Sequence, residues 1–196
     1  MSNFIDHTYF TGELNIVLKA TSDYDNAISM YQDEILKLLL GYKTWKEMMA
    51  AYEASIRTLN PVTLEAKWSN LINGCEFEYT INGETYFDKW VGFKNSEKKS
   101  LIANYVYFFY RRDKYSDTTS AGETISKTEN SMVINPYSKL VTAWNKMVDM
   151  YGKLDCFDNP EPLPSAYNFL NANAADYPDW KFTKMDKILS INRWLV

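Results

Sequence analysis

Histidine is the scarcest residue type of catalytic interest in this chain. His7 is the single histidine among 196 residues. Imidazole, with a pKa of roughly 6.5, is the side chain that most readily exchanges protons at physiological pH, so its scarcity removes most hydrolytic and histidine-metal mechanisms. A catalytic triad on His7 stays open, but no Gly-x-Ser-x-Gly elbow accompanies it, and the chain has no dinucleotide, P-loop, zincin or EF-hand motif. We therefore interpret His7 as a surface or turn residue.

Cysteine, basic charge and long apolar runs are also in short supply. Cys75 and Cys156 are too few for a disulfide framework and lack metal-ligand spacing. A net charge of -4 and a pI of about 5.1 do not fit a general nucleic-acid binder. No stretch approaches the roughly 18 apolar residues of a membrane span, and residues 1–8 lack the plan of a signal peptide. We expect a soluble intracellular product with no metal, no cofactor and no membrane partner.

Aromatic residues are abundant instead, with 15 Tyr, 10 Phe and 6 Trp. A hydrophobic fraction of 46% against 23% charged residues is typical of a globular chain, and the length fits one domain with an arm. We expect a helical domain over residues 1–154 and a proline-rich linker with a docking arm over residues 155–196.

Helical spacing of apolar residues predicts a bundle of about five helices, so the fold class is mainly α. The clearest stripe runs from Tyr24 to Leu39, and Gly41 suits a left-handed stop after it. Helix starts are assigned from Ser22 with Asp25, Thr44 with Glu47, Asn60 before Pro61, Ser96, and Asn135 before Pro136. The expected helices cover residues 22–40, 44–56, 61–73, 97–112 and 136–151, with a shorter helical piece at 165–173.

The hydrophobic period changes to two between residues 75 and 90, which predicts an inserted β-hairpin with its turn at Asn82-Gly83. This register places Tyr79 opposite Tyr86 and Glu76 opposite Lys89. Because a lone hairpin is barely stable in water, it must pack on the helices or on another subunit.

Glu76 and Glu78 lie two apart on the first hairpin strand and so share one face. Paired carboxylates are the one acid-base device left to this chain, which keeps open a small enzyme or a regulatory binding module. The other interpretation, which we favour, is the solvated face of an amphipathic hairpin.

The helix at 97–112 is apolar or aromatic nearly all round, so we expect it to be central, and its ends are basic. One interpretation is solvated helix ends; the other is a basic surface for an acidic partner or for passing DNA. Residues 114–135 are polar and predict a long mobile loop. The basic candidates are Lys94, Lys98, Lys99, Arg111 and Arg112.

Both ends of the chain carry bulky apolar residues. Residues 4–14 have no helical period and predict an extended arm with a turn near Gly12, and the C-terminal arm must dock on its own domain or on a neighbour, since exposed apolar ends favour aggregation. Aromatic residues outside helical stripes are the better interface candidates, because Tyr, Trp and Phe anchor protein contacts. These candidates are Tyr9, Phe10, Phe87, Trp180 and Trp194.

Three segments together resemble small virion proteins of tailed bacteriophages and prophages from Bacteroides-type hosts. They are the opening residues 4–16, the helix end at residues 31–42, and the closing Tyr177-Pro178-Asp179-Trp180-Lys181-Phe182. The aromatic helix at 101–112 and Ala143-Trp144-Asn145 add to the likeness. These virion proteins are head-to-tail connector proteins, also called adaptor or head-completion proteins.

The resemblance implies a mainly helical, non-catalytic subunit of the virion neck, made in the host cytoplasm. It would form a homo-oligomeric ring, typically twelvefold, beneath the portal, with loops and arms that reach the portal protein above and tail or neck proteins below. Contact with packaged DNA would be non-specific. The hairpin and the long C-terminal arm are larger than a minimal helical connector requires. A tail-completion or neck protein at another position in the same virion is the alternative.

Overall fold

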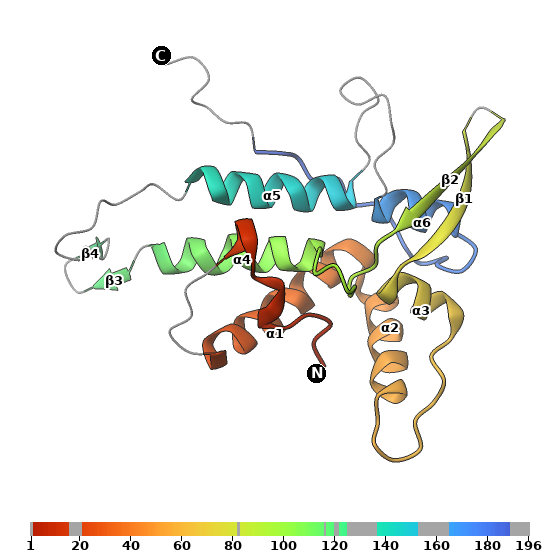
Figure 1. Cartoon of the computed structure of the whole chain (residues 1–196), viewed down its shortest axis with the longest axis horizontal. Helices are drawn as coiled ribbons and strands as arrows, with labels where there is room; N and C mark the ends of the chain where they lie inside the picture. The colour runs from red at the N-terminus through yellow and green to blue at the C-terminus, as the bar shows by residue number, and fades with distance from the viewer. Residues whose placement is uncertain are drawn as a thin grey trace.

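The computed structural model describes residues 2–15, 21–81, 83–115, 117–119, 122–124, 137–152 and 165–188. Within these ranges the chain is mainly helical, with one long β-hairpin inserted between helices, which confirms the predicted fold class (Figure 1). In the order of the chain, the described elements are η1 (His7–Tyr9), η2 (Gly12–Leu14), α1 (Thr21–Leu40), α2 (Tyr42–Ser55), α3 (Ala66–Asn73), β1 (Cys75–Ile81), β2 (Glu84–Trp90), α4 (Leu101–Tyr115), β3 (Asp117–Thr119), β4 (Gly122–Thr124), α5 (Tyr137–Tyr151) and α6 (Ala166–Ala172).

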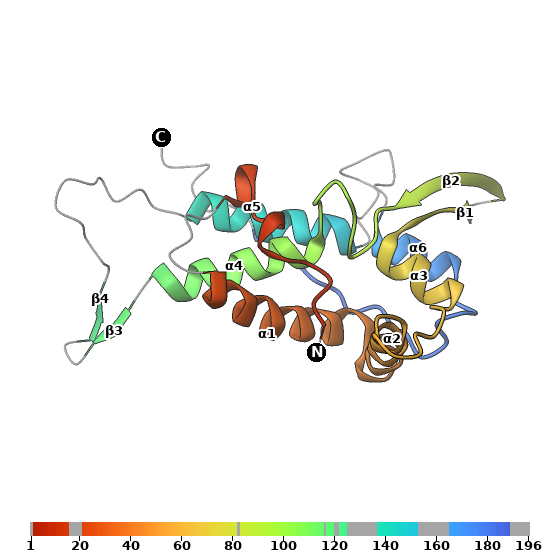
Figure 2. The same ribbon diagram turned by 60° about the horizontal axis from the view of Figure 1, so that its bottom comes forward.

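Helix α4 is the centre of the molecule. It lies between α1 and α5 and contacts both, an order visible in two views (Figures 1 and 2). All residues from Leu101 to Tyr107 are buried, which agrees with the nearly all-round apolar character of this segment.

The start of α4 differs from the prediction, because the serine that caps it is Ser100 rather than Ser96. The Asn95 side chain accepts a hydrogen bond from the Lys99 amide at 3.1 Å, and Lys98 has a left-handed backbone with φ of 57°, so these residues form a turn. The Ser100 hydroxyl then accepts a hydrogen bond from the Ile102 amide at 3.2 Å. Because of this turn, α4 begins four residues later in the chain than predicted.

Two other helix starts also correct the prediction. Helix α2 begins directly after Gly41, so Thr44 lies buried in the first turn instead of capping it. Helix α3 begins at Ala66 and not at Pro61. Asn60 has a φ of 53°, which is far from the extended backbone that an N-cap residue needs. Residues 56–65 consequently form a long loop between α2 and α3.

Strands β1 and β2 pair in the predicted register, with Tyr79 opposite Tyr86 and Glu76 opposite Lys89. The base of the hairpin packs on the helices: Phe77 contacts Phe169 of α6 with ring centroids 5.5 Å apart. The indole of Trp90 is fully buried. The hairpin therefore gains its support from its own subunit at the base.

The segment expected to be a long mobile loop contains a second, short antiparallel pair formed by β3 and β4. Residues 125–135 of the expected loop lie outside the described residues. Helix α6 confirms the short helical piece, because the Ser165 hydroxyl caps it by accepting a hydrogen bond from the Asn168 amide at 3.2 Å.

The N-terminal segment is part of the core. Instead of a purely extended arm, it forms the two short 3-10 turns η1 and η2, with Gly12 at a φ of 59°. Phe4 lies edge-on to Tyr52 at 4.8 Å between ring centroids, and Tyr9 is buried beside the turn that precedes α4. The hydroxyl of Tyr9 donates to the Asn95 carbonyl at 2.9 Å and accepts from the Asn95 amide at 3.0 Å.

Replacing Tyr9 with phenylalanine tests this anchor. Tyr9→Phe removes both hydrogen bonds and leaves the Asn95 amide without its acceptor, so we expect the free energy of unfolding to fall by about 1–3 kcal/mol in denaturant titrations. The control is Tyr42→Phe, at an exposed ring, with an expected change within about 0.5 kcal/mol. Equal effects at the two positions would contradict the anchor.

Residues 165–188 dock on their own domain, one of the two arrangements expected for the C-terminal arm. The Tyr177 hydroxyl donates to the Lys67 carbonyl at 2.6 Å. The Leu39 carbonyl, in the last turn of α1, accepts hydrogen bonds from the Trp180 indole at 3.1 Å and from the Tyr151 hydroxyl at 3.3 Å. The proline-rich linker at 155–164 lies outside the described residues.

The buried tyrosines predict a loss of stability at alkaline pH. Burial, with the hydrogen bond to the Asp113 carboxylate, raises the pKa of Tyr31 from 10.0 to about 12, and burial raises the pKa of Tyr105 well above its usual range. The unfolded chain releases these protons near pH 10 while the folded chain retains them, so this stability is intact below about pH 10 and is lost between about pH 10 and 12.

Denaturant titrations at rising pH measure this effect. Tyr105→Phe should make the fall in unfolding free energy with pH shallower, because one retained proton is removed. A stability that stays level from pH 10 to 12 would contradict the expectation.

Candidate functional site

The outward face of the hairpin carries Phe87, the most exposed large hydrophobic side chain on a described helix or strand. Residues alternate along each strand, so Phe77 and Tyr79 face the body while the intervening side chains face away. Phe87 lies at the centre of the outward face with 78% of its surface exposed, directly opposite Glu78. We call this surface the hairpin face, and its residues, all exposed, are Glu76, Glu78, Thr80, Thr85, Phe87 and Lys89.

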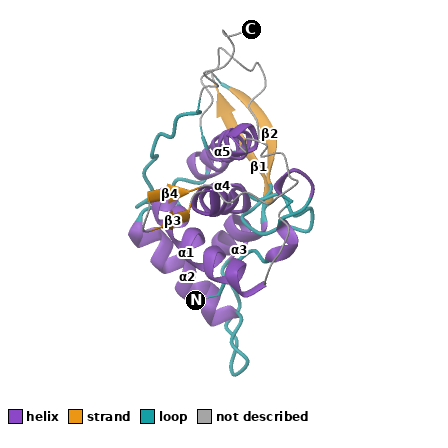
Figure 3. Cartoon of the chain, turned by 90° about the vertical axis from the view of Figure 1, so that its left-hand side faces the viewer, coloured by secondary structure: helices purple, strands orange, loops and turns teal. Residues whose placement is uncertain are grey.

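A second exposed apolar surface lies on the 56–65 loop. Ile56, Leu59 and Val62 are 49%, 83% and 61% exposed. The hairpin and this loop project from opposite sides of the helical body, at the top and the bottom of the molecule in two views (Figures 1 and 3). Clusters of exposed apolar side chains, such as the one on the loop, commonly mark contacts with other proteins, and Phe87 adds one exposed ring on the hairpin.

A cleft of about 910 Å³ lies between the N-terminal 3-10 turns, the start of α4 and α5. Apolar contributions to its lining come from Leu14, Val91, Ala143 and Met150. Four lysines surround these residues, and we call the feature the lysine cleft. These lysines are Lys98, Lys99, Lys139 and Lys146, and all four side chains are exposed.

Three of the four lysines already have partners. The Lys146 ammonium pairs with Glu13, and this hydrogen-bonded contact lowers the pKa of the Glu13 carboxyl. Lys99 pairs with Glu97 at 3.0 Å, and the Lys98 ammonium lies 4.6 Å from the centroid of the Tyr9 ring. Lys139 makes no ion pair with any described residue.

Asn104 gives the cleft an unusual polar group. Its side chain lines the cleft and is only 6% exposed. The amide nitrogen donates to the Ser100 carbonyl at 3.0 Å, but the side-chain oxygen, buried, has no hydrogen-bond partner among the described residues. A buried acceptor without a donor costs about 1–3 kcal/mol, so this oxygen is a local loss of stability in the wall of the cleft.

The five basic candidates fall into two groups at opposite ends of α4. Lys94, Lys98 and Lys99 precede α4, whereas Arg111 and Arg112 lie in its last turns, about 15 Å further along the axis at 1.5 Å per residue. The first group opens onto the lysine cleft and a smaller neighbouring hollow. In the second group, Arg112 pairs with Asp113 at 3.1 Å and covers the Phe109 ring.

The interface candidates differ in how much of each side chain is exposed. Tyr9 and Phe10 are 3% and 6% exposed within the chain's own core, so they are not available to a neighbour, and the prediction for these two residues is wrong. Trp180 is half-buried and bonded to the Leu39 carbonyl. Phe87 is exposed as expected, and Trp194 lies outside the described residues.

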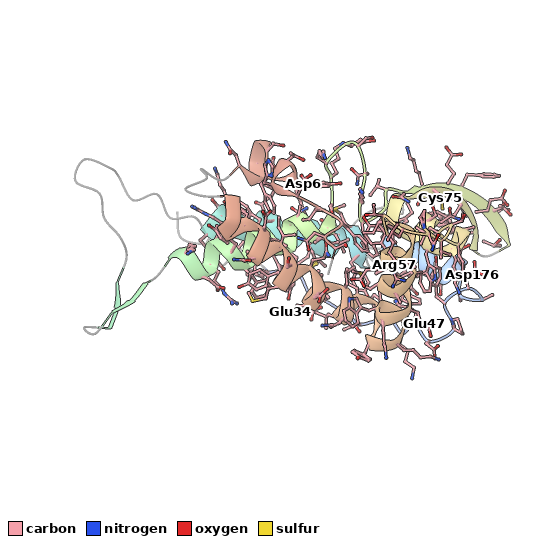
Figure 4. All side chains as sticks on the ribbon, turned by 90° about the horizontal axis from the view of Figure 1, so that it is seen from below. Asp6, Glu34, Glu47, Arg57, Cys75 and Asp176 are labelled. Atoms are coloured by element: carbon pink, nitrogen blue, oxygen red, sulfur yellow. The ribbon has the colours of Figure 1, made fainter. Side chains whose placement is uncertain are left out.

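The residues considered for catalysis do not converge. Glu76 and Glu78 share the exposed hairpin face, and His7 is exposed in η1. Burial raises the pKa of the Cys75 thiol, which disfavours the reactive thiolate, and Cys156 lies outside the described residues. No metal-binding group of three or more His, Cys, Asp or Glu occurs among the described residues. In Figure 4 the labelled Asp6 and Glu34 lie near the middle of the molecule, and Glu47 and Asp176 lie toward the end that carries the hairpin.

Sequence reasoning missed the lysine cleft and the apolar loop. The cleft takes its lysines from two segments about 40 residues apart in the chain, an association that spacing alone does not reveal. One signal was present: Lys139 and Lys146 are seven residues apart and so share a face of α5. The loop was missed because residues 61–65 were assigned to a helix.

No family model, curated protein or solved structure matches this chain. In the described part of the chain, no helix is both long and apolar enough to cross a membrane.

Proposed function

We propose that this chain is a structural subunit of a tailed-phage virion, a connector that bridges head and tail and performs no catalysis. It acts as a ring of copies between the portal protein and tail or neck proteins, located at the neck. The observation that carries the proposal is that the hairpin with its exposed Phe87 and the apolar 56–65 loop project from opposite sides of the helical body. A bridging subunit needs separate contacts of this kind, because it must bind more than one partner at once.

The chemistry of the surfaces supports a contact role. Phe87 and Leu59 expose large apolar side chains, and burying such a side chain contributes about 1.5–3 kcal/mol to an association. The carboxylates once considered for acid-base chemistry, Glu76 and Glu78, flank Phe87 on an open face where water solvates them. Charged residues around an apolar centre are the usual arrangement of a protein interface.

Particles of the phage or prophage that encodes the chain provide the test. Mass spectrometry should detect the chain in purified, tailed particles, and cryo-electron microscopy should place its density at the junction of portal and tail. Density at another neck or tail position would support the tail-completion alternative. Particles that lack the chain altogether would refute a structural virion role.

A loss-of-contact variant adds a functional readout. Leu59→Asp places a charge on the 56–65 loop without touching the core, so the variant should fold normally while yielding heads that fail to join tails. Met30→Asp, at another exposed apolar position on α1, is the matched control and should leave assembly unchanged. Normal assembly with both variants would remove the loop from the proposed contacts.

A further inference from the structure

The hairpin face and the lysine cleft have complementary shape and charge. The hairpin face presents one exposed aromatic side chain, Phe87, next to Glu78, which makes no ion pair with a described residue. The cleft presents apolar lining surrounded by lysines, of which Lys139 is without an ion pair in the described part of the chain. The hairpin face therefore offers an aromatic ring and a carboxylate, and the cleft offers an apolar lining and an ammonium group.

We infer that the hairpin face of one copy of this chain binds in the lysine cleft of a second copy. Phe87 would enter the apolar part of the cleft, and the carboxylates of Glu76 and Glu78 would meet the lysines around it. The inference rests on the proposed function, because it names a partner within the assembly. This contact between copies does not use the 56–65 loop, which would bind a different protein of the virion.

The size of the cleft fits this occupant. At about 910 Å³ it lies at the upper end of volumes that hold whole small-molecule ligands, so one aromatic side chain and its strand neighbours can be accommodated.

The charges support contact between copies. The hairpin face carries Glu76, Glu78 and Lys89, and the cleft contains four lysines against Glu13, Glu97 and Asp149, so the two surfaces have opposite net sign. Complementary potentials of this kind steer association and disfavour the alternative of two hairpin faces meeting, where the glutamates would repel.

The hairpin cannot occupy the cleft of its own chain. Its tip points away from α4 and α5 in both views of the ribbon (Figures 1 and 2). Because the two surfaces differ and each copy carries both, the contact is head-to-tail and can continue from copy to copy. Such a contact generates a closed ring or an open filament according to the rotation between neighbours.

A mixing experiment tests the inference. Phe87→Ser disables the hairpin face and keeps the cleft, whereas Lys139→Glu disables the cleft and keeps the hairpin face. In sedimentation velocity, each variant alone should self-associate at least tenfold more weakly than the native chain. An equimolar mixture should form one-to-one dimers and nothing larger, since only one intact hairpin-cleft contact can form per pair.

Matched controls separate this contact from general surface effects. Met30→Ser and Lys46→Glu change exposed residues of α1 and α2 outside both surfaces and should leave association unchanged. Circular dichroism should show native helix content for every variant. Combining Glu78→Lys with Lys139→Glu in one chain should recover part of the lost association, because the charges are exchanged across the contact.

Each outcome decides the inference. A native chain that remains monomeric at every accessible concentration, variants that associate like the native chain, or a mixture that does not form dimers would overturn it. These results can be distinguished from a failure of the proposed function. The chain can be present at the portal-tail junction while the mixing experiment fails, or can form the dimers while purified particles lack it.

Discussion

Trp90→Ala should lower the free energy of unfolding by about 3–5 kcal/mol, the largest effect expected of any side-chain truncation in the hairpin. The indole is fully buried at the base of β2, and its ring lies 5.6 Å from Phe93 and 6.3 Å from Phe169 between centroids. Its ring nitrogen also donates to the Leu71 carbonyl at 2.9 Å. Truncation leaves a cavity and an acceptor without its donor.

Two further variants apportion this loss. Trp90→Phe keeps most of the apolar volume but loses the hydrogen bond to Leu71, so its cost should be smaller than that of Trp90→Ala, with about 1–3 kcal/mol from the lost bond. Phe87→Ala, on the exposed face of the same strand, should change stability by no more than about 0.5 kcal/mol. Denaturant titrations measure all three. Similar losses at positions 87 and 90 would mean that the hairpin base does not pack as described.

Gly92→Ala should be at least as damaging, through the backbone. Gly92 has a φ of 81° in the left-handed region, and a Cβ there would lie 2.5 Å from the carbonyl carbon of Asn73 and 2.5 Å from the Gly74 nitrogen. These atoms belong to the backbone that joins α3 to β1, so they cannot move aside as a flexible side chain would. We expect a loss of at least about 3 kcal/mol, or no folded protein in the soluble fraction.

Gly41→Ala is the control for backbone conformation without crowding. Its φ of 76° is nearly the same, but an added Cβ would meet no heavy atom within 4 Å. With a ψ of 156° this backbone conformation is one that residues other than glycine rarely adopt, so the conformation alone should cost about 1–3 kcal/mol. If the two alanine variants lost equal stability, close backbone approach at the hairpin base would not contribute, and the difference between the two glycines would have no energetic meaning.

Sequence patterns predicted correctly those elements whose geometry is set by residues close together in the chain. The register of β1 and β2 follows from the alternation of side chains and from the Asn-Gly pair, and both cross-strand pairs were predicted correctly. The stripe of α1 and the stop at Gly41 were correct for the same reason. In these segments each residue's environment is decided by neighbours a few positions away.

The start of α4 could not be predicted because a distant residue decides it. Ser96 and Ser100 are equally good caps by sequence. Asn95 is held in its turn by the hydroxyl of Tyr9, a contact across 86 positions of sequence, and the turn moves the helix start to Ser100. The same contact explains why Tyr9 was mistaken for an interface residue: an apolar arm without helical period can cover its own core or a neighbour, and sequence alone does not distinguish the two.

Only part of the candidate site was within reach of the sequence. Phe87 was named as an interface candidate because it lies outside the helical stripes, and the structure places it on the outward face of the hairpin, opposite Glu78. The lysine cleft was not predicted, because the segment before α4 meets α5 only through tertiary packing. Lys139 gains its place in the cleft from that packing and not from any neighbour in sequence.

The hydrogen bonds to the Leu39 carbonyl have a consequence for how the chain folds during synthesis. This acceptor terminates α1, near the beginning of the chain, yet its donors are Tyr151 and Trp180, which are 112 and 141 positions later. Most of the polypeptide must therefore be synthesised before this end of α1 gains its tertiary partners. Contacts of such long sequence separation slow folding, so the nascent chain exposes apolar surface for most of its synthesis.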